Sequence, residues 1–237
     1  MTLSEKETAY LQMYNGLQQY YYYQIKNELD KLTFDFVSNP TPEIKAIAAD
    51  GVTNVLRNLY EDVAVRFYYS RFENINSLES RQSITDGIRS FFNNEIQSRA
   101  TGIVDNTKGF LQSIYRRVVG DRTVDQELRK IMQQEVNTLN VNRSTVISGT
   151  ETHTASNYGM YAYMNDIEGQ GIAFTRFWGS VLGPTTRKTH AAAHKQKANK
   201  DGLFLIGREL LRFPGDPRGS VANTVNCLCF TYIGEIE

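Results

Sequence analysis

Apolar residues recur at steps of three and four positions along the first two thirds of the chain, which is the period of one face of an α-helix. This pattern predicts six amphipathic helices separated by short polar stretches. They are expected over residues 3–37, 42–72, 77–99, 107–119, 123–139 and 144–164. Short connections between such helices favour antiparallel packing, so the pattern indicates a bundle with several long members.

Residues that cap helix ends support these boundaries. Four of the helices are preceded by hydroxyl or carboxylate side chains that can bind the free amides of a first turn, or by a proline suited to a first position. These start signals are Ser4 with Glu7, Thr41 before Pro42, Thr123 with Gln126, and Ser144. Gly120 follows the fourth helix, where a glycine C-cap is expected.

Beyond residue 171 the apolar period changes to two, the period of a β-strand. The expected strands are residues 172–178, 203–206, 209–213 and 225–233. The second and third of these flank Gly207-Arg208, a pair suited to a two-residue hairpin turn. The predicted fold class is therefore α+β, with an N-terminal long-helix bundle followed by a small α+β domain that holds a short antiparallel sheet.

The polar run Asn140–Ser144 separates the fifth and sixth helices and is the expected domain boundary. It divides the chain into a helical domain, residues 1–142, and an α+β domain, residues 143–237. The helical domain carries no recognisable chemistry, but it holds four consecutive tyrosines, Tyr20–Tyr23, that must point to several sides of one helix. They are either packed between helices with their hydroxyls in water or part of a contact surface for a partner protein.

Composition and charge exclude some classes of protein. The apolar fraction of 41% and the charged fraction of 22% are ordinary for a globular protein. The formal net charge is zero, so the chain as a whole lacks the electrostatic character of a nucleic-acid binder. No apolar run is long enough to span a membrane, and the first ten residues are too polar for a signal peptide. Two cysteines one residue apart do not make a disulfide framework, which fits a reducing cytoplasm.

All three histidines and both cysteines lie beyond residue 145 and suggest a metal site. His190 and His194 are four apart in an expected helix, and Cys227 and Cys229 are two apart in an expected strand, so each pair shares a face. Together they would supply the two cysteines and two histidines that bind zinc tetrahedrally. The alternative is that the cysteines are small buried hydrophobes, with His190 hydrogen-bonded in the core and His194 in solvent.

Two further interpretations of this region stay open. A cysteine beside a histidine is also a nucleophile pair, in which Glu151 or Asp201 would orient the ring. The balance of charge turns basic over residues 187–218, which suits non-specific contact with DNA phosphates or an ordinary lysine-rich loop. The side chains expected at such a contact are Arg187, Lys188, Lys195, Lys197 and Lys200.

The order of short motifs in residues 144–232 resembles the C-terminal domain of the phage Mu F-like head morphogenesis proteins, the minor capsid proteins of tailed phages. The matching positions are Thr150, Glu151, Trp178, Thr186, Arg187, His190, Pro214, Gly215, Asp216, Pro217, Asn226, Cys227 and Cys229. The chain departs from the family where an acidic residue usually precedes the Thr-Arg pair and where an arginine usually separates the cysteines. Here Thr185 and Leu228 stand at those places.

The resemblance implies a non-enzymatic minor head protein that associates with the portal and aids head morphogenesis, with a role in DNA packaging or ejection. Its expected partners are the portal, other capsid proteins and packaged DNA, with no membrane contact. Its expected location is the virion, after synthesis in the host cytoplasm. The resemblance calls for no cofactor, while the residues leave zinc open. The alternatives are a nuclease- or toxin-like enzyme domain and a zinc-stabilised DNA-binding module.

Overall fold

The computed structural model describes residues 2–44, 47–70 and 78–234, with side chains throughout these ranges except at 78–84. It confirms the α+β fold class. Four long helices form the bundle: α1 (Leu3–Ser38), α2 (Asp50–Tyr69), α3 (Leu78–Val118) and α4 (Gln126–Gly169). The remaining elements are β1 (Thr175–Gly179), α5 (Lys188–Ala192), β2 (Phe204–Ile206), β3 (Glu209–Leu211), α6 (Val221–Thr224) and β4 (Phe230–Gly234).

The strands make two small antiparallel sheets rather than one. β1 pairs with β4, with Phe177 opposite Tyr232, and β2 pairs with β3, with Leu205 opposite Leu210. The hairpin prediction is confirmed, and Gly207 adopts a φ of 63° in its turn. The first and last strands are shorter than expected, since β1 begins at residue 175 and β4 at residue 230. Consequently Cys227 and Cys229 lie in the loop before β4, not in a strand.

The second helix begins later than the sequence pattern predicts. Thr41 does not cap it, because its hydroxyl donates to the carbonyl of Glu43, and α2 starts only at Asp50. The apolar side chains of Ile44 and Ile47 pack against the hydrophobic core from a loop, which explains why they resembled a helix stripe. The expected end of this helix, at residue 72, and the start of the next, at residue 77, lie outside the described residues.

The third and fourth expected helices are one continuous helix, α3. The predicted break before Thr107 is wrong, because the Thr107 hydroxyl donates to the Ile103 carbonyl within the helix instead of capping a new one. Ala100 and Val104 are buried across the same stretch and extend the apolar face. Gly120 ends α3 as predicted, with a φ of 58° and its amide bonded to the Tyr115 carbonyl.

The fifth and sixth expected helices are also one, α4, so the break predicted at Asn140–Ser144 is wrong. The Ser144 hydroxyl donates to the Asn140 carbonyl one turn back, and the Asn140 amide donates to Asp30 and Thr33 of α1. These polar side chains are used inside the bundle, not at a helix end. The division into two domains at this point stays a prediction, although α4 runs through it.

Two helix starts are capped by neighbours of the predicted residues. Thr2 with Glu5 forms the capping box of α1, two positions before the expected pair Ser4 and Glu7. Asp125 caps α4 by accepting from the Leu128 amide, in place of the expected Thr123. In both cases a capping side chain two positions away from the expected one takes its place, since several suitable side chains lie close together there.

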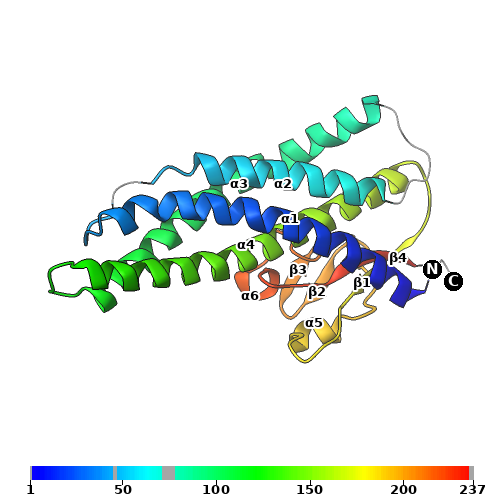
Figure 1. Cartoon of the computed structure of the whole chain (residues 1–237). Coiled ribbons are helices and arrows are strands. Elements are labelled where there is room, and N and C mark those ends of the chain that lie inside the picture. Colours follow the sequence, from blue (N-terminus) through cyan, green and yellow to red (C-terminus); the bar gives the residue numbers. More distant parts are fainter. Residues whose placement is uncertain (1, 45–46, 71–77, 235–237) are drawn as a thin grey trace.

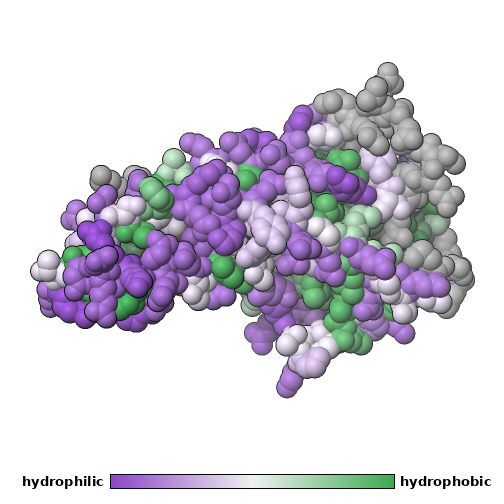
Figure 2. Space-filling model, in the orientation of Figure 1, coloured by the Kyte–Doolittle hydropathy of each residue, from purple (hydrophilic) through white to green (hydrophobic). Residues whose placement is uncertain are grey.

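The long helices form an elongated bundle, and the strands and short helices lie against α4 and α1 near one end of it (Figure 1). At the other end, the C-terminal turns of α1 and α3 and the first turns of α4 share a small apolar cluster; we call this end the distal arm. Its core residues are Phe36, Leu111, Ile114, Val118, Val119, Leu128, Met132 and Val136. On the face seen in Figure 2 the arm is largely hydrophilic. Among the described residues, no helix combines the length and the apolar character needed to cross a membrane.

Candidate functional site

The centre of the molecule is a stretch of α4, Ile147–Met160, in which every residue is buried. We call it the central segment. It is surrounded because α1 and α2 pack on one side of α4, while β4 and the C-terminal loops cover the rest. Much of it is polar: Ser148, Thr150, Glu151, Thr152, His153, Thr154, Ser156 and Asn157. A helix that is buried all round is normally apolar, so these side chains require partners inside the protein.

Two side chains of the central segment hold the loop that carries the cysteines. His153 Nε2 lies 2.7 Å from the Cys229 carbonyl oxygen, and the Asn157 amide donates to the same oxygen at 3.2 Å. The Asn157 carbonyl oxygen accepts from the Thr231 amide at 3.2 Å. Burial lowers the pKa of His153 to about 4, so the ring is neutral and Nε2 is its donor. These bonds place the Cys229 backbone against α4.

His190, Cys227 and Cys229 form a buried cluster beside this loop. His190 Nδ1 lies 3.3 Å from the Cys229 sulfur and 3.4 Å from the Cys227 sulfur. The three potential ligand atoms all lie within 4.8 Å of one another, and each residue is at most 3% exposed. This group could hold a metal ion, since two sulfurs and one imidazole nitrogen converge on one point.

The contact made by the other ring nitrogen of His190, Nε2, leaves Nδ1 free to act as the ligand atom. Nε2 lies 3.3 Å from the Asn223 side-chain oxygen, so the proton belongs on Nε2 and the Nδ1 lone pair faces the sulfurs. An outer hydrogen bond of this kind orients most metal-bound histidines. The Cys227 thiol lowers the pKa of Cys229, whereas the neighbouring Cys229 sulfur and burial raise the pKa of Cys227.

The cluster also resembles a cysteine–histidine–asparagine triad, because a cysteine contacts a histidine ring whose other nitrogen contacts an asparagine. Neither predicted orienting carboxylate takes part: Glu151 is bound elsewhere, and it is Asn223 that contacts the ring. A nucleophile must reach its substrate, however, and both Cys229 and His190 are buried. Two thiols that converge on one imidazole nitrogen are therefore better suited to hold a metal ion than to act as a nucleophile.

The predicted set of four ligands is therefore corrected to three. His194 lies in the turn after α5, where its Nδ1 accepts from the Ser180 amide at 3.2 Å, and it is not part of the cluster. Short α5 ends at Ala192, so the helix that was to place both rings on one face does not extend far enough. His153 was missed because a histidine amid hydroxyl residues has the pattern of a solvated helix face.

The positions that carry the family resemblance are brought together although they are far apart in sequence. Thr150 Oγ1 accepts from the Asn226 amide at 3.3 Å, and the Arg187 guanidinium donates to the Val225 carbonyl. Trp178 is fully buried with its ring edge-on to His190, 6.0 Å between centroids. These contacts join α4, the β1 and α5 region and the loop before β4 into one unit.

The loop Pro214–Pro217 closes the same unit from the other side. Asp216 is fully buried and accepts hydrogen bonds from Arg212 and Arg218. Burial alone would raise its pKa, but these bonds lower the pKa of Asp216 to about 2. Gly215, with a φ of 81°, lies so close to His153 that a Cβ there would come within 2.8 Å of Nδ1. The loop thus packs closely against the central segment.

Glu151 completes the central segment with a buried ion pair. Its two oxygens accept from Arg99 of α3 at 2.9 and 2.8 Å, and the Tyr60 hydroxyl of α2 also donates to it. Its side chain is 7% exposed and that of Arg99 19%. The remaining resemblance position, Thr186, bonds to the Val181 carbonyl and to the Gly183 amide in the turn before α5.

The five expected DNA-contacting residues do not behave alike. Lys188, Lys195, Lys197 and Lys200 are exposed, while Arg187 is occupied by its bond to the Val225 carbonyl. Leu228, where the family usually has an arginine, is 40% exposed. That departure therefore alters the surface above the cluster and not the cluster itself.

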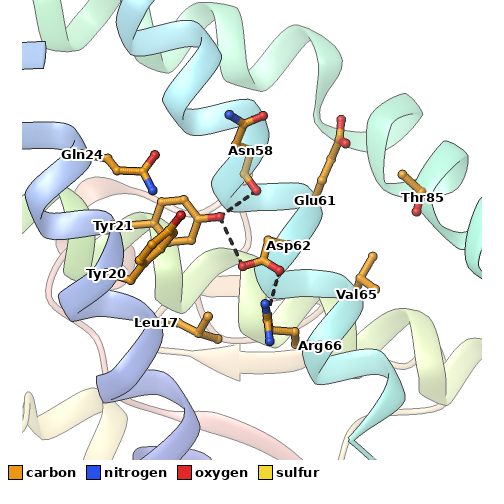
Figure 3. Close-up of a pocket in the computed structure, with 10 residues that line it drawn as sticks. All are labelled: Leu17, Tyr20, Tyr21, Gln24, Asn58, Glu61, Asp62, Val65, Arg66 and Thr85. Atoms are coloured by element: carbon orange, nitrogen blue, oxygen red, sulfur yellow. Dashed lines mark hydrogen bonds and ion pairs between the residues drawn. The ribbon is translucent and has the colours of Figure 1, made fainter.

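The tyrosine run divides between core and surface. Tyr20 and Tyr23 are 59% and 63% exposed, whereas Tyr21 is buried and donates to the Asn58 carbonyl and to Asp62 of α2. Tyr20 borders a cleft of about 680 Å³ between α1 and α2 (Figure 3). The side chains of Gln24 and Asn58 also line this cleft.

No protein-family model matches this chain, and no characterised protein or solved structure is significantly similar to it. The resemblance to the Mu F-like proteins accordingly stays a prediction that rests on the ordered motif residues.

Proposed function

We propose that this protein is a non-enzymatic minor head protein of a tailed bacteriophage that associates with the portal and aids head morphogenesis. One observation carries the proposal: motif positions far apart in the sequence meet on or beside the central segment of α4. Thr150 meets Asn226, Gly215 meets His153, and His190 meets both cysteines. Residues that fold into one unit are better evidence of a shared architecture than the same residues scattered over a surface would be.

Co-purification with portal rings is the direct test. The full chain, produced together with the portal protein of the same phage, should elute with the ring, and purified virions should contain the chain. A chain that stays monomeric beside assembled rings and is missing from virions would refute the proposal.

The portal-docking surface is proposed to be the outward face of α1. Between Thr8 and Asn27, the exposed residues of this face carry no charge: they are Thr8, Ala9, Gln12, Asn15, Gly16, Gln19, Tyr20, Tyr23 and Asn27. Exposed helix faces are normally charged, whereas interface centres are rich in tyrosine and poor in lysine and glutamate. The cleft in Figure 3 continues this face toward α2.

Replacement of Tyr20 and Tyr23 by serine should weaken ring binding at least tenfold while leaving the unfolding midpoint nearly unchanged, since both rings are exposed. Phe34→Ser is the matched control, because Phe34 is an exposed aromatic residue on the same helix but outside the uncharged stretch. Equal loss of binding in both variants would show that the effect is not local to the tyrosines.

The cofactor of the cluster is proposed to be zinc. Thiolate and imidazole ligands in a buried, closed site are the combination that structural zinc takes. Zinc there would tie α5 to the loop before β4 and so couple the folding of the C-terminal region to metal. The protein should therefore contain stoichiometric zinc, and a strong chelator should lower its melting temperature. His190→Ala should abolish zinc binding and His194→Ala should retain it. A protein that is purified without zinc and whose melting temperature does not respond to chelator would contradict the zinc site, and the three side chains would then serve only in packing.

A zinc-stabilised DNA-binding module is the second candidate, favoured by the four exposed lysines of the α5 region. Their replacement by glutamine should remove DNA binding and flatten its salt dependence. DNA affinity that persists in this variant, or that is missing in the wild-type protein at low salt, would argue against this candidate.

A further inference from the structure

We propose that the hydroxyl oxygen of Ser180 is the fourth ligand of the metal held by His190, Cys227 and Cys229. The inference rests on the zinc site proposed above and specifies how that site is closed. It turns a three-ligand cluster into a complete tetrahedral one made by this chain alone.

The distances within the cluster are already close to those of a metal site. Zinc bonds of about 2.3 Å to sulfur and about 2.0–2.1 Å to nitrogen, at tetrahedral angles, place sulfur and nitrogen about 3.6 Å apart. The sulfurs of Cys229 and Cys227 lie 3.3 and 3.4 Å from His190 Nδ1. Each sulfur therefore needs to move away from Nδ1 by only a few tenths of an ångström to reach this separation.

Ser180 borders the cluster on its Cys229 side. Its side-chain oxygen is 3.6 Å from the Cys229 sulfur, which is also about the sulfur–oxygen separation across a tetrahedral zinc ion. The residue is 1% exposed, so this oxygen is shielded from solvent. Its hydrogen atom is used elsewhere, because the hydroxyl donates to the His190 carbonyl at 2.6 Å. The lone pairs are thus left for the cluster.

The backbone holds Ser180 firmly in this place. It follows β1 directly, and its amide donates to His194 Nδ1. The preceding residue, Gly179, lies against the Phe230 ring, where a Cβ would come within 2.6 Å. The bond between Ser180 and His194 also gives the second histidine a role: it positions the fourth ligand and is not itself one.

Other protein donors are less suitable. In the described part of the chain the metal-ligating group contains only the histidine and the two cysteines. His153 Nδ1 lacks a hydrogen-bond partner there, but it faces Gly215 and belongs to no such group. A neutral serine hydroxyl also balances charge, since zinc with two thiolates has no net charge and a bound hydroxide would add a buried negative one. Binding releases two protons, one from each thiol.

Cobalt(II) replaces zinc in such sites and reports its own coordination. Wild-type protein loaded with cobalt should show the intense visible bands of a tetrahedral ion, with sulfur-to-cobalt charge transfer and no exchangeable water in pulsed EPR. Ser180→Ala should weaken cobalt binding at least about tenfold and admit one water molecule to the ion. Ser180→Cys should restore tight binding and increase the charge-transfer intensity by one thiolate.

The cysteine variant separates ligation from packing, because a hydroxyl that merely packs would not be improved by a thiolate. Water bound to cobalt in the wild-type protein, together with an unchanged spectrum in Ser180→Ala, would overturn Ser180 as ligand and leave the metal site standing. A wild-type protein that binds neither cobalt nor zinc would overturn the metal site and this inference together.

Discussion

Between Gln126 and Val146 helix α4 buries one face, whereas between Ile147 and Met160 it buries every residue. In the first half the buried positions follow one another every four residues: the apolar Leu128, Met132 and Val136 in the distal arm, then Asn140 and Ser144. The central segment instead holds hydroxyls, an amide, an imidazole and a carboxylate among its buried groups. One helix thus contains an ordinary amphipathic half and a half that depends on specific partners.

The difference has consequences for how each half tolerates change. An apolar stripe gains free energy from buried area and accepts substitutions that keep its size and polarity. A buried polar segment loses the full desolvation cost of any group whose partner is removed. We therefore expect matched substitutions to lower the free energy of unfolding several times more in the central segment than in the distal arm.

The largest contrast should come from two ion pairs that both join α3 to α4. Arg99–Glu151 is buried, with side chains 19% and 7% exposed, whereas Arg117–Glu135 lies at the surface of the arm, with 60% and 41%. Glu151→Ala should cost about 3–5 kcal/mol because it leaves a buried guanidinium without its partner. Glu135→Ala should cost about 0–1 kcal/mol. Chemical denaturation measures both, and similar losses would contradict the comparison.

Two glycines of α4 provide the next contrast. A Cβ at Gly159 would lie 2.2 Å from the Ala64 carbonyl oxygen of α2, while at Gly169 nothing lies within 4 Å. Gly159→Ala should therefore separate α2 from α4 and cost about 3 kcal/mol. Gly169→Ala should be neutral or stabilise by less than about 1 kcal/mol through helix propensity. If Gly159→Ala is tolerated equally well, the close approach of the two helices is not required.

Hydrophobic periodicity predicted the helical bundle and the α+β class because these depend on one buried face per element. It failed where polar side chains are buried. Asn140 and Ser144 looked like a break between helices, yet both make hydrogen bonds inside the bundle. Thr107 likewise resembled a cap and bonds within its own helix. A sequence shows the polarity of a residue but not whether a carbonyl one turn back or a side chain on another helix will satisfy it.

The candidate site was predictable in part for a related reason. His190, Cys227 and Cys229 were singled out by residue type, since few other side chains bind metal, and by the spacing within each histidine and cysteine pair. Their elements were placed less well: the cysteines lie in a loop, and α5 is too short to include His194. Ser180 and Asn223 carried no signal, because serine and asparagine are common in loops and only the fold brings them to His190.

A pH titration tests the central segment through its histidine. The native pKa of His153 is about 4, below the ordinary value of 6.5, so protons bind more tightly to the unfolded chain. Stability is complete above pH 6.5 and should fall by about 2 kcal/mol by pH 5. The measurement is made in excess chelator, so that release of metal does not contribute. His153→Gln, which keeps a donor for the Cys229 carbonyl, should lose this part of the pH dependence; an unchanged slope would place the titration elsewhere.

The smallest expected effect tests whether every polar group of the central segment is satisfied. The buried Thr152 hydroxyl has no hydrogen-bond partner in the described part of the chain, whereas the exposed Thr138 hydroxyl of the distal arm bonds to the Gln134 carbonyl. Thr152→Val replaces an unpaired hydroxyl with a methyl group of similar size and should stabilise the protein by up to about 1 kcal/mol. Thr138→Val should change stability by less than about 0.5 kcal/mol. A loss of more than about 1 kcal/mol at Thr152 would instead indicate a buried water molecule that bridges its hydroxyl to a neighbouring polar group.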